Sequence, residues 1–272
     1  MPSPSAIAVA FEAVLILAGL AVLWRMALSP TARTRPVMPL LPKWEIPPLN
    51  FLFFLWGIYA GGFLVQFIVF QLLASVASLT PEMRLIMASA GTDAGMIIAW
   101  LLAKPRLDPR PVATPAPVRG KIPWLSGALT FLAVWPLVIL VMLVWQNGLG
   151  ALGIPLEKQE AIDIFANARD PLWLGFLISF AVVLAPFTEE LVHRGAIFRF
   201  ARGWLPHWLA LLGPACIFAA LHWNLASFAP LVALAVVFSL VYERTGDIRV
   251  TMIAHGLFNL NTAVLIFAGI GM

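Results

Sequence analysis

Long apolar windows separated by short polar stretches make up most of this chain. A helix of about 20 mainly apolar residues is long enough to cross the hydrocarbon core of a bilayer. The pattern therefore predicts an all-α polytopic membrane protein with about eight transmembrane helices. The eight windows run approximately over residues 6–28, 49–76, 83–103, 124–147, 172–200, 208–223, 226–242 and 250–270.

Composition supports lipid as the main surroundings of the protein. Of 272 residues, 61% are hydrophobic and 11% are charged, whereas soluble domains have roughly 45–50% apolar and 25% charged residues. The net charge of +4 lies mainly in predicted loops and forms no basic arm, so no nucleic-acid partner is expected. The single cysteine, Cys216, excludes an intrachain disulfide.

Lysine and arginine residues cluster in alternate loops. These clusters follow the first, third, fifth and seventh windows, over residues 25–43, 104–121, 199–202 and 244–249. By the positive-inside rule these loops are cytoplasmic. We therefore expect a multi-pass protein of the cell membrane, with both termini and the acidic loop at 157–170 outside.

Polar residues divide the predicted helices into two groups. We expect four N-terminal helices with Pro-rich cytoplasmic loops over residues 1–170, and a catalytic core of four helices over 171–270. In the first group, Glu12 and Asp93 lie well inside apolar windows and are isolated from other ionisable groups in sequence. A structural partner explains either residue as well as a functional role does. The spacing of Gly57 and Gly61 predicts close packing against a neighbouring helix.

Ionisable residues within the C-terminal windows form a denser set. A charged side chain at the bilayer centre costs about 2.5–3.5 kcal/mol on insertion scales, so such residues need an explanation. All four histidines lie in this third of the chain, and three of them share its membrane windows with two adjacent glutamates. These residues are His193, His207, His222, His255, Glu189 and Glu190.

The fifth window contains a Glu-Glu-x-x-x-Arg motif. Glu190 and Arg194 are four positions apart and lie on one helical face, where an ion pair forms. Glu189 points in another direction. This pairing neutralises one carboxylate and leaves Glu189 available as a general base or acid. A Glu/Arg cluster that caps a helix end at the interface is the alternative for this segment.

Two further motifs follow in the sixth and eighth windows. Phe218 precedes His222 by one helical turn and can pack on its ring; we expect His222 at mid-membrane depth on the sixth helix. By itself, a histidine bonded to a nearby carbonyl is the commoner situation. His255 and Asn259 are also four positions apart, so both polar groups face the same groove. In an otherwise apolar span, this pair favours function.

Taken together and in this order, Glu-Glu-x-x-x-Arg, Phe-x-x-x-His and His-x-x-x-Asn on successive membrane helices resemble the CPBP family of intramembrane proteases. That family is also called Abi and includes the CAAX prenyl endopeptidases of the Ras-converting type. The resemblance covers roughly residues 171–268, and the first half of the chain matches only in having apolar helices. One departure is His193, at a position where the family usually has an aromatic or aliphatic residue.

The resemblance implies a role for each residue of the three motifs. Glu189, helped by His222, would activate the attacking water, while Glu190 and Arg194 would form the supporting pair. His255 and Asn259 would hold the developing oxyanion. The family is often called a metalloprotease, and carboxylates with histidines can bind a divalent metal such as zinc. However, the chain lacks the His-Glu-x-x-His of metalloprotease helices, so the metal stays open.

Two other classes of function stay open alongside a protease. A transporter or proton relay would line a path with the same glutamates and histidines. A non-catalytic immunity or scaffold protein would use the same fold to bind a membrane peptide. As a protease, the protein would act on a membrane peptide or a lipidated protein, and the sequence does not say whether that substrate is prenylated.

Overall fold

The structure, a computed structural model, describes residues 4–34, 41, 44, 46–107, 123–156 and 160–270. All regular structure within these ranges is helical, which confirms the predicted all-α class. Seven helical segments of the described residues are long and apolar enough to cross a membrane. These segments are 6–28, 48–73, 81–104, 123–151, 171–204, 225–245 and 248–267.

Four long helices form the N-terminal part of the chain. The first, α1 (Pro4–Leu23), continues into the π-helical turn η1 (Trp24–Leu28) and is followed by the short α2 (Pro30–Arg33). The helices α3 (Pro48–Leu73) and α4 (Pro81–Leu107) form a hairpin, and α5 (Pro123–Ala151) comes next. Proline occupies the first turn of α3, α4 and α5, where its missing N–H removes no helical hydrogen bond.

The fifth segment is one continuous helix with two π-helical turns. After the short α6 (Glu160–Asn167) come α7 (Pro171–Ser179), η2 (Phe180–Leu184), α8 (Ala185–Val192), η3 (His193–Phe198) and α9 (Arg199–Trp204). Asp170 caps the start of α7, because its side chain accepts a hydrogen bond from Trp173 N at 2.7 Å. The α8 turn, which carries both glutamates, thus lies between the two π-helical turns.

The sixth predicted window forms a shorter helix than expected. It gives α10 (His207–Ala220), whose 14 residues span about 21 Å at 1.5 Å per residue, less than the hydrocarbon core of about 30 Å. The expectation of eight spanning helices is corrected to seven plus this short helix among the described residues. The chain then turns through Trp223, which has a left-handed φ of 50° and is 92% exposed.

The last two helices follow clear start and stop signals. Asn224 caps α11 (Leu225–Thr245) by accepting from Ser227 N at 2.9 Å, and Gly246 ends that helix with a φ of 65°. Asp247 caps α12 (Ile248–Phe267), accepting from Arg249 N at 3.0 Å. The guanidinium of Arg249, bonded to Asp247, holds the pKa of that carboxyl below its usual range.

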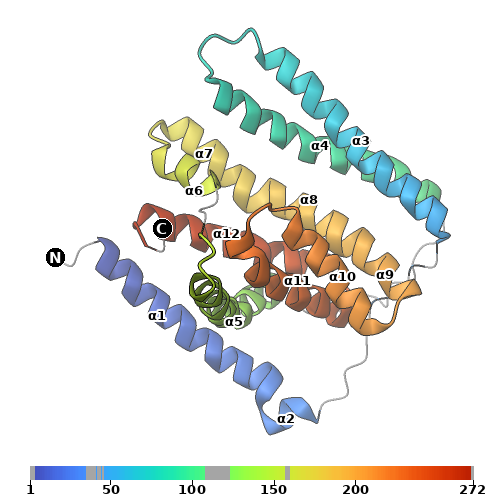
Figure 1. Cartoon of the computed structure of the whole chain (residues 1–272). Helices are drawn as coiled ribbons and strands as arrows, with labels where there is room; N and C mark the ends of the chain where they lie inside the picture. Colours follow the sequence, from blue (N-terminus) through green and yellow to red (C-terminus); the bar gives the residue numbers. More distant parts are fainter. Residues whose placement is uncertain are drawn as a thin grey trace.

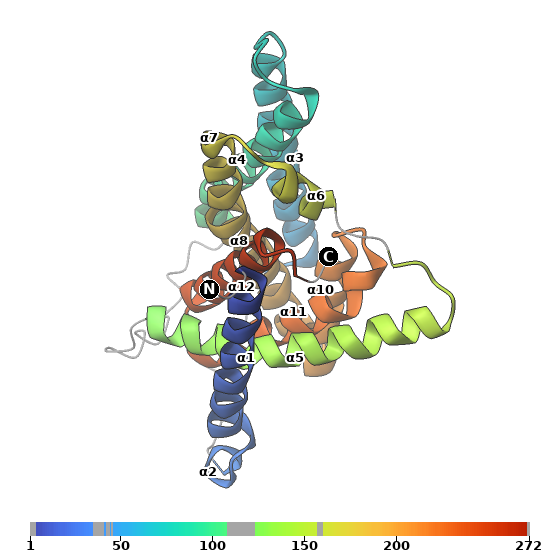
Figure 2. The same ribbon diagram turned by 90° about the vertical axis from the view of Figure 1, so that its left-hand side faces the viewer.

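Helix packing places α12 at the centre of the molecule. It contacts α5, η2, α8 and α11, while α11 also packs on α5 and α10 (Figure 1). The helix α1 crosses α5 on the outside of this core (Figure 2). The α3–α4 hairpin joins the core chiefly through contacts of α4 with α8 and η2. The C-terminal helices and α8 therefore form a core to which the other elements attach.

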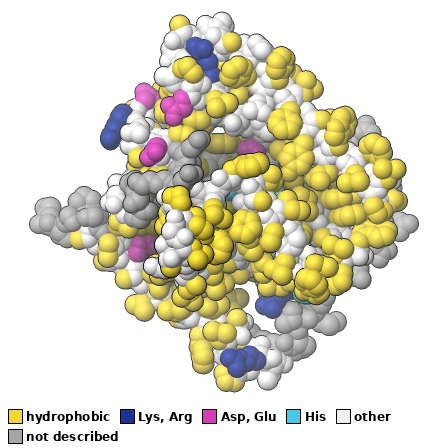
Figure 3. All heavy atoms as spheres, in the orientation of Figure 1, with side chains coloured by type: hydrophobic (Ala, Val, Ile, Leu, Met, Phe, Trp, Pro, Cys, Tyr) yellow, Lys and Arg dark blue, Asp and Glu magenta, His cyan; other side chains and the backbone are white. Residues whose placement is uncertain are grey.

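The predicted lipid contact agrees with the surface of the protein. Hydrophobic side chains cover most of the face shown in Figure 3, and basic side chains appear only at a few places near its edge. Large apolar side chains such as Leu17, Phe53 and Val144 are more than half exposed. Such a surface is stable in lipid and would aggregate in water.

Close packing confirms one of the two glycine predictions. A Cβ on Gly61 would lie 2.7 Å from the Cβ of Ala99 in α4, so α3 and α4 approach too closely for a larger residue. A Cβ on Gly57 would meet nothing within 4 Å, so the packing role predicted for it is wrong. The sidedness and the two-part division of the chain stay predictions, and the basic residues at 35, 43, 110, 119 and 121 and Glu157 lie outside the described residues.

Candidate active site

The two glutamates of α8 have different surroundings. Glu190 is 0% exposed and pairs with Arg194, with Oε1 and Nη1 2.8 Å apart, so the predicted i,i+4 ion pair is present. The Glu189 side chain is 30% exposed, and its Oε2 is buried with no hydrogen-bond partner among the described residues. The helix thus holds one carboxylate in an ion pair and leaves its neighbour open for chemistry.

His255 joins α12 to both glutamates. Its Nδ1 lies 3.0 Å from Oε1 of Glu190, and its Nε2 lies 3.7 Å from Oε2 of Glu189. Because an ionised carboxylate only accepts hydrogen bonds, Nδ1 carries the hydrogen in this contact. The imidazole is 4% exposed and packs on Phe238 of α11. Its orientation is therefore fixed from two sides.

Asn259, the second polar residue of α12, forms a hydrogen bond with a π-helical turn. Asn259 donates a hydrogen bond from Nδ2 to the backbone oxygen of Ala181 in η2, at 2.8 Å. A Cβ on Gly256 would lie only 2.5 Å from the oxygen of Val182, so α12 and η2 touch at the backbone. His255 and Asn259 thus face the same long helix, as their spacing predicts. The π-helical turn η2 is a local widening of the kind that often marks functional sites.

Phe218 of α10 lies at the centre of the aromatic and cationic groups. It is 1% exposed, and its ring centroid lies 4.8 Å from that of His222 and 6.2 Å from that of His255. The guanidinium carbon of Arg194 lies 4.7 Å from the same centroid, a cation–π geometry. The predicted packing of Phe218 on His222 is therefore present, and this ring connects the three motifs.

His222 lies in the turn after α10 rather than on the helix itself. The last residue of α10 is Ala220, so the expectation of a helical His222 is corrected by two residues. Its Nδ1 lies 2.9 Å from the backbone oxygen of Phe218. Because that carbonyl only accepts, Nδ1 carries the hydrogen and Nε2 is left with a lone pair. This tautomer suits an acceptor for a water hydrogen.

His193, the departure from the family pattern, lies inside this cluster. It is 7% exposed, and its ring packs edge-on against Phe218 with centroids 5.1 Å apart. Its Nδ1 is buried with no hydrogen-bond partner among the described residues. It therefore packs beside the three motifs through Phe218.

The two isolated acidic residues of the N-terminal half lie in different surroundings. Glu12 accepts from Trp135 Nε1 at 2.9 Å and from Asn261 Nδ2 at 2.8 Å, so it has a structural role. Asp93 of α4 is half-buried, and α4 packs on α8, the helix that carries Glu189. The sequence alone does not predict this packing, because Asp93 and Glu189 are 96 positions apart.

The described residues offer few ligands for a metal. No group of three or more His, Cys, Asp or Glu among them could hold a metal ion. Oε1 of Glu190 is already bonded to Arg194 and His255. The donor set of the described residues does not fit a zinc site with three protein ligands.

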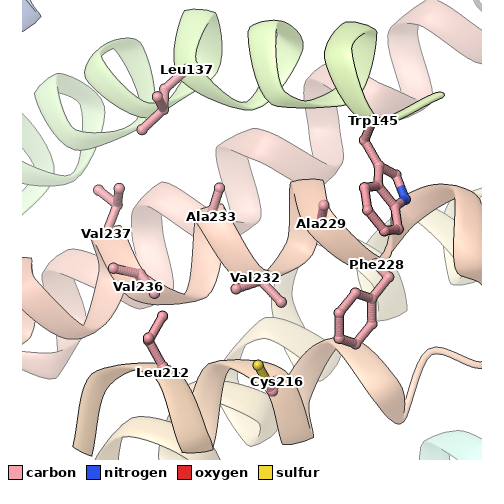
Figure 4. A pocket seen from close by; sticks show the side chains of 10 residues that line it. All are labelled: Leu137, Trp145, Leu212, Cys216, Phe228, Ala229, Val232, Ala233, Val236 and Val237. Carbon is pink, nitrogen blue, oxygen red and sulfur yellow. The ribbon is translucent and has the colours of Figure 1, made fainter. Parts of the chain in front are cut away.

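A separate pocket of about 420 Å³ lies between α5, α10 and α11. Its lining is apolar and includes Trp145, Cys216 and Phe228 (Figure 4). None of the residues of the three motifs lines it. It is therefore distinct from the candidate active site.

Comparison with known proteins matches the part of the chain that carries the three motifs. Residues 171–261 match the Type II CAAX prenyl endopeptidase Rce1-like family. This segment is similar to that family. The expected resemblance is thereby confirmed over α7 to α12, which contribute all six candidate residues.

A curated relative supports the same family. The UPF0177 protein YbdI of Lactococcus lactis subsp. lactis (strain IL1403) is 32% identical over 113 residues. That alignment covers 41% of this chain and 59% of the relative, so the chain spans less than two thirds of the relative's length. No solved structure matches the chain.

Proposed function

We propose that this protein is an intramembrane endopeptidase that hydrolyses a peptide bond of a membrane-associated peptide or lipidated protein. The Rce1-like match over residues 171–261 supports a CAAX-type intramembrane protease in general. The observation that carries the proposal is the contrast within α8: Glu190 is 0% exposed and accepts from both Arg194 and His255 through Oε1, whereas the Glu189 side chain is 30% exposed and lies beside the same imidazole.

In the proposed reaction, Glu189 takes a proton from the attacking water. The lone pair of His222 Nε2 accepts the other hydrogen of that water and orients its oxygen. The water oxygen forms a bond to the carbonyl carbon of the substrate as the proton moves to Glu189. Glu189 then gives this proton to the leaving nitrogen, the C–N bond breaks, and a carboxyl and an amine are released.

The oxyanion is held by donors from α12. His255 keeps Nδ1–H on Glu190, and its Nε2 donates to the oxyanion when it carries a hydrogen. Asn259 uses one Nδ2 hydrogen on Ala181 and offers the second. Both donors are held by protein contacts before the reaction, which is the condition for strong stabilisation of a developing charge. Prenylation of the substrate is a hypothesis that rests on the family resemblance.

The test is cleavage of a fluorogenic farnesylated CAAX peptide by the purified protein in detergent. Glu189→Gln should lower kcat by about 100-fold or more and leave the melting temperature close to that of the wild type. An unprenylated peptide of the same sequence shows whether the lipid is required. A chelator arm shows whether a metal is required.

Glu82→Gln is the matched control, because Glu82 is an exposed glutamate at the start of α4. It should cleave at the wild-type rate. Full turnover by Glu189→Gln would contradict the assignment of the base. No cleavage of a range of membrane peptides by the wild type would contradict the protease, and a transporter or scaffold would then be tested.

A further inference from the structure

The turn that carries His222 has a strained backbone. Trp223, the next residue, has a φ of 50°, in the left-handed region that a bulky side chain rarely adopts. A residue stays in such a region only where its surroundings hold it there. On the α10 side, the N–H of His222 donates to the oxygen of Ala219 at 3.2 Å. The N–H of Trp223 donates to the oxygen of Ala220 at 3.1 Å. These bonds fix one end of the turn, and the other end must be fixed by α11.

Proline weakens the first turn of α11. Pro230 is buried within this helix and has no N–H. The backbone oxygen of Ala226, four positions earlier, therefore lacks the donor that a regular α-helix would give it. The proline ring also pushes the same carbonyl group out of line. The first turn of α11 thus needs donors from outside the helix.

Two side chains near the end of α5 donate to this first turn. Trp145 Nε1 lies 2.7 Å from the backbone oxygen of Leu225. Gln146 Nε2 makes a longer contact of 3.5 Å with the oxygen of Ala226, the one without a helical donor. Leu225 follows His222 by three residues. The helix α5, which packs on α11, therefore holds the chain immediately after the strained turn.

We infer that Trp145 is a positioning residue for His222, because its hydrogen bond fixes the α11 end of the strained turn. The indole is itself held by packing, since it lines the apolar pocket beside Phe228 of α11 (Figure 4). Trp145 lies outside the segment 171–261 that matches the family, so the N-terminal helices contribute to the site through it. Its effect on catalysis rests on the proposed function, whereas the restraint of the turn does not.

The primary test is hydrogen exchange of the full-length protein in detergent, measured by mass spectrometry on a peptide that covers residues 218–226. Trp145→Phe keeps an aromatic ring in the pocket and removes the N–H donor. Exchange of the turn should become several-fold faster, whereas exchange of the α12 peptide that contains His255 should not change. The control is Trp124→Phe in the same helix, because Trp124 is 70% exposed. Its turn should exchange at the wild-type rate.

A second substitution tests whether Trp145 acts against the strain. Glycine adopts a left-handed φ without steric cost, and the exposed side chain of Trp223 has few contacts to lose. Trp223→Gly in the Trp145→Phe background should therefore recover much of the lost protection of the turn. A double variant that exchanges as fast as Trp145→Phe would contradict the role of the strain. Equal exchange in the wild type and Trp145→Phe would overturn the inference.

Cleavage kinetics give a further readout. Trp145→Phe should lower kcat about tenfold with little change in KM, because a misplaced His222 slows the chemical step. In the His222→Gln background the same substitution should cause no further loss, since it acts through His222. An equal loss in both backgrounds would overturn the positioning role. If the wild type cleaves no peptide but exchange of the turn depends on Trp145, the proposed function fails and the restraint stands.

Discussion

Nδ1 of His255 lies 3.0 Å from Oε1 of Glu190, the same oxygen that accepts from Arg194 at 2.8 Å. One buried carboxylate oxygen therefore holds together α8, η3 and α12. The contact also explains why two adjacent glutamates differ in their roles. Glu190 holds Arg194 and His255 through one oxygen, whereas the partly exposed Glu189 lies beside the same imidazole, with its Oε2 3.7 Å from Nε2.

This arrangement predicts that Glu190→Gln destabilises the protein strongly. The substitution leaves the guanidinium of Arg194, whose side chain is 2% exposed, without its counter-charge. Breaking a buried ion pair on one side costs about 3–5 kcal/mol. The melting temperature in detergent should fall well below that of Glu189→Gln, and this comparison is the measurement.

Removing both partners provides the control for that prediction. Replacing Glu190 and Arg194 together by Leu and Met should recover much of the lost stability, since no charge is left buried. Cleavage should not recover, because His255 loses the acceptor for Nδ1. A melting temperature of Glu190→Gln equal to that of the wild type would contradict the structural role of the pair.

Phe218 provides a second prediction, because its ring touches His222, His255 and Arg194. Phe218→Leu keeps an apolar side chain and loses the ring, including a desolvated cation–π contact worth about 2 kcal/mol. We expect kcat to fall by up to about 100-fold through misplacement of the histidines, and the melting temperature to fall moderately. Kinetics and thermal unfolding of the same preparation separate the two effects.

The control for Phe218 is Phe228→Leu in the separate apolar pocket of α5, α10 and α11. Among the described residues, no ring contact joins Phe228 to a residue of the three motifs. Its replacement should leave kcat unchanged. Equal kinetic effects of the two substitutions would show that Phe218 has no special role in holding the site.

Much of this site follows from the sequence because its residues act within single helices. The pairs Glu190–Arg194 and His255–Asn259 are each four positions apart within one continuous helix, and this spacing alone fixes a shared face. Contacts between helices do not follow from spacing. The two donors to Glu12 could not be predicted, because they depend on how distant helices cross.

The length of α10 also escaped prediction for a physical reason. Hydropathy treats the apolar residues up to Trp223 as one window, but the helix ends at Ala220 and a turn follows. Leu221 and Trp223 in this turn are exposed, so hydropathy reports their contact with lipid and not their backbone conformation. His222 therefore lies in a turn, although the apolar residues around it predict a helix.

Glu12 gives a third prediction, about the attachment of α1. Its two oxygens accept from Trp135 in α5 and Asn261 in α12, and hydrogen bonds to a charged group contribute about 1.5–3 kcal/mol each. Glu12→Leu should lower the melting temperature markedly. Glu12→Gln should cause a smaller loss, because both partners are donors and an amide offers one acceptor oxygen. An unchanged melting temperature in Glu12→Leu would contradict this attachment.

Gly256 gives the last prediction, because α12 touches η2 at this residue. A Cβ here would lie 2.5 Å from the backbone oxygen of Val182, so Gly256→Ala must push α12 away from the π-helical turn. Overpacking of this kind costs about 1–3 kcal/mol. The shift also lengthens the bond from Asn259 to Ala181, and kcat should fall more than stability alone explains.

Gly175 in α7 is the matched control for Gly256, since a Cβ there would meet nothing within 4 Å. Gly175→Ala should leave cleavage unchanged and should raise stability slightly, because alanine favours a helix by up to about 1 kcal/mol over glycine. Thermal unfolding and cleavage kinetics of both variants check the pair. If Gly256→Ala behaves like Gly175→Ala, the close contact between α12 and η2 does not position Asn259, and the oxyanion role of that side chain would need another support.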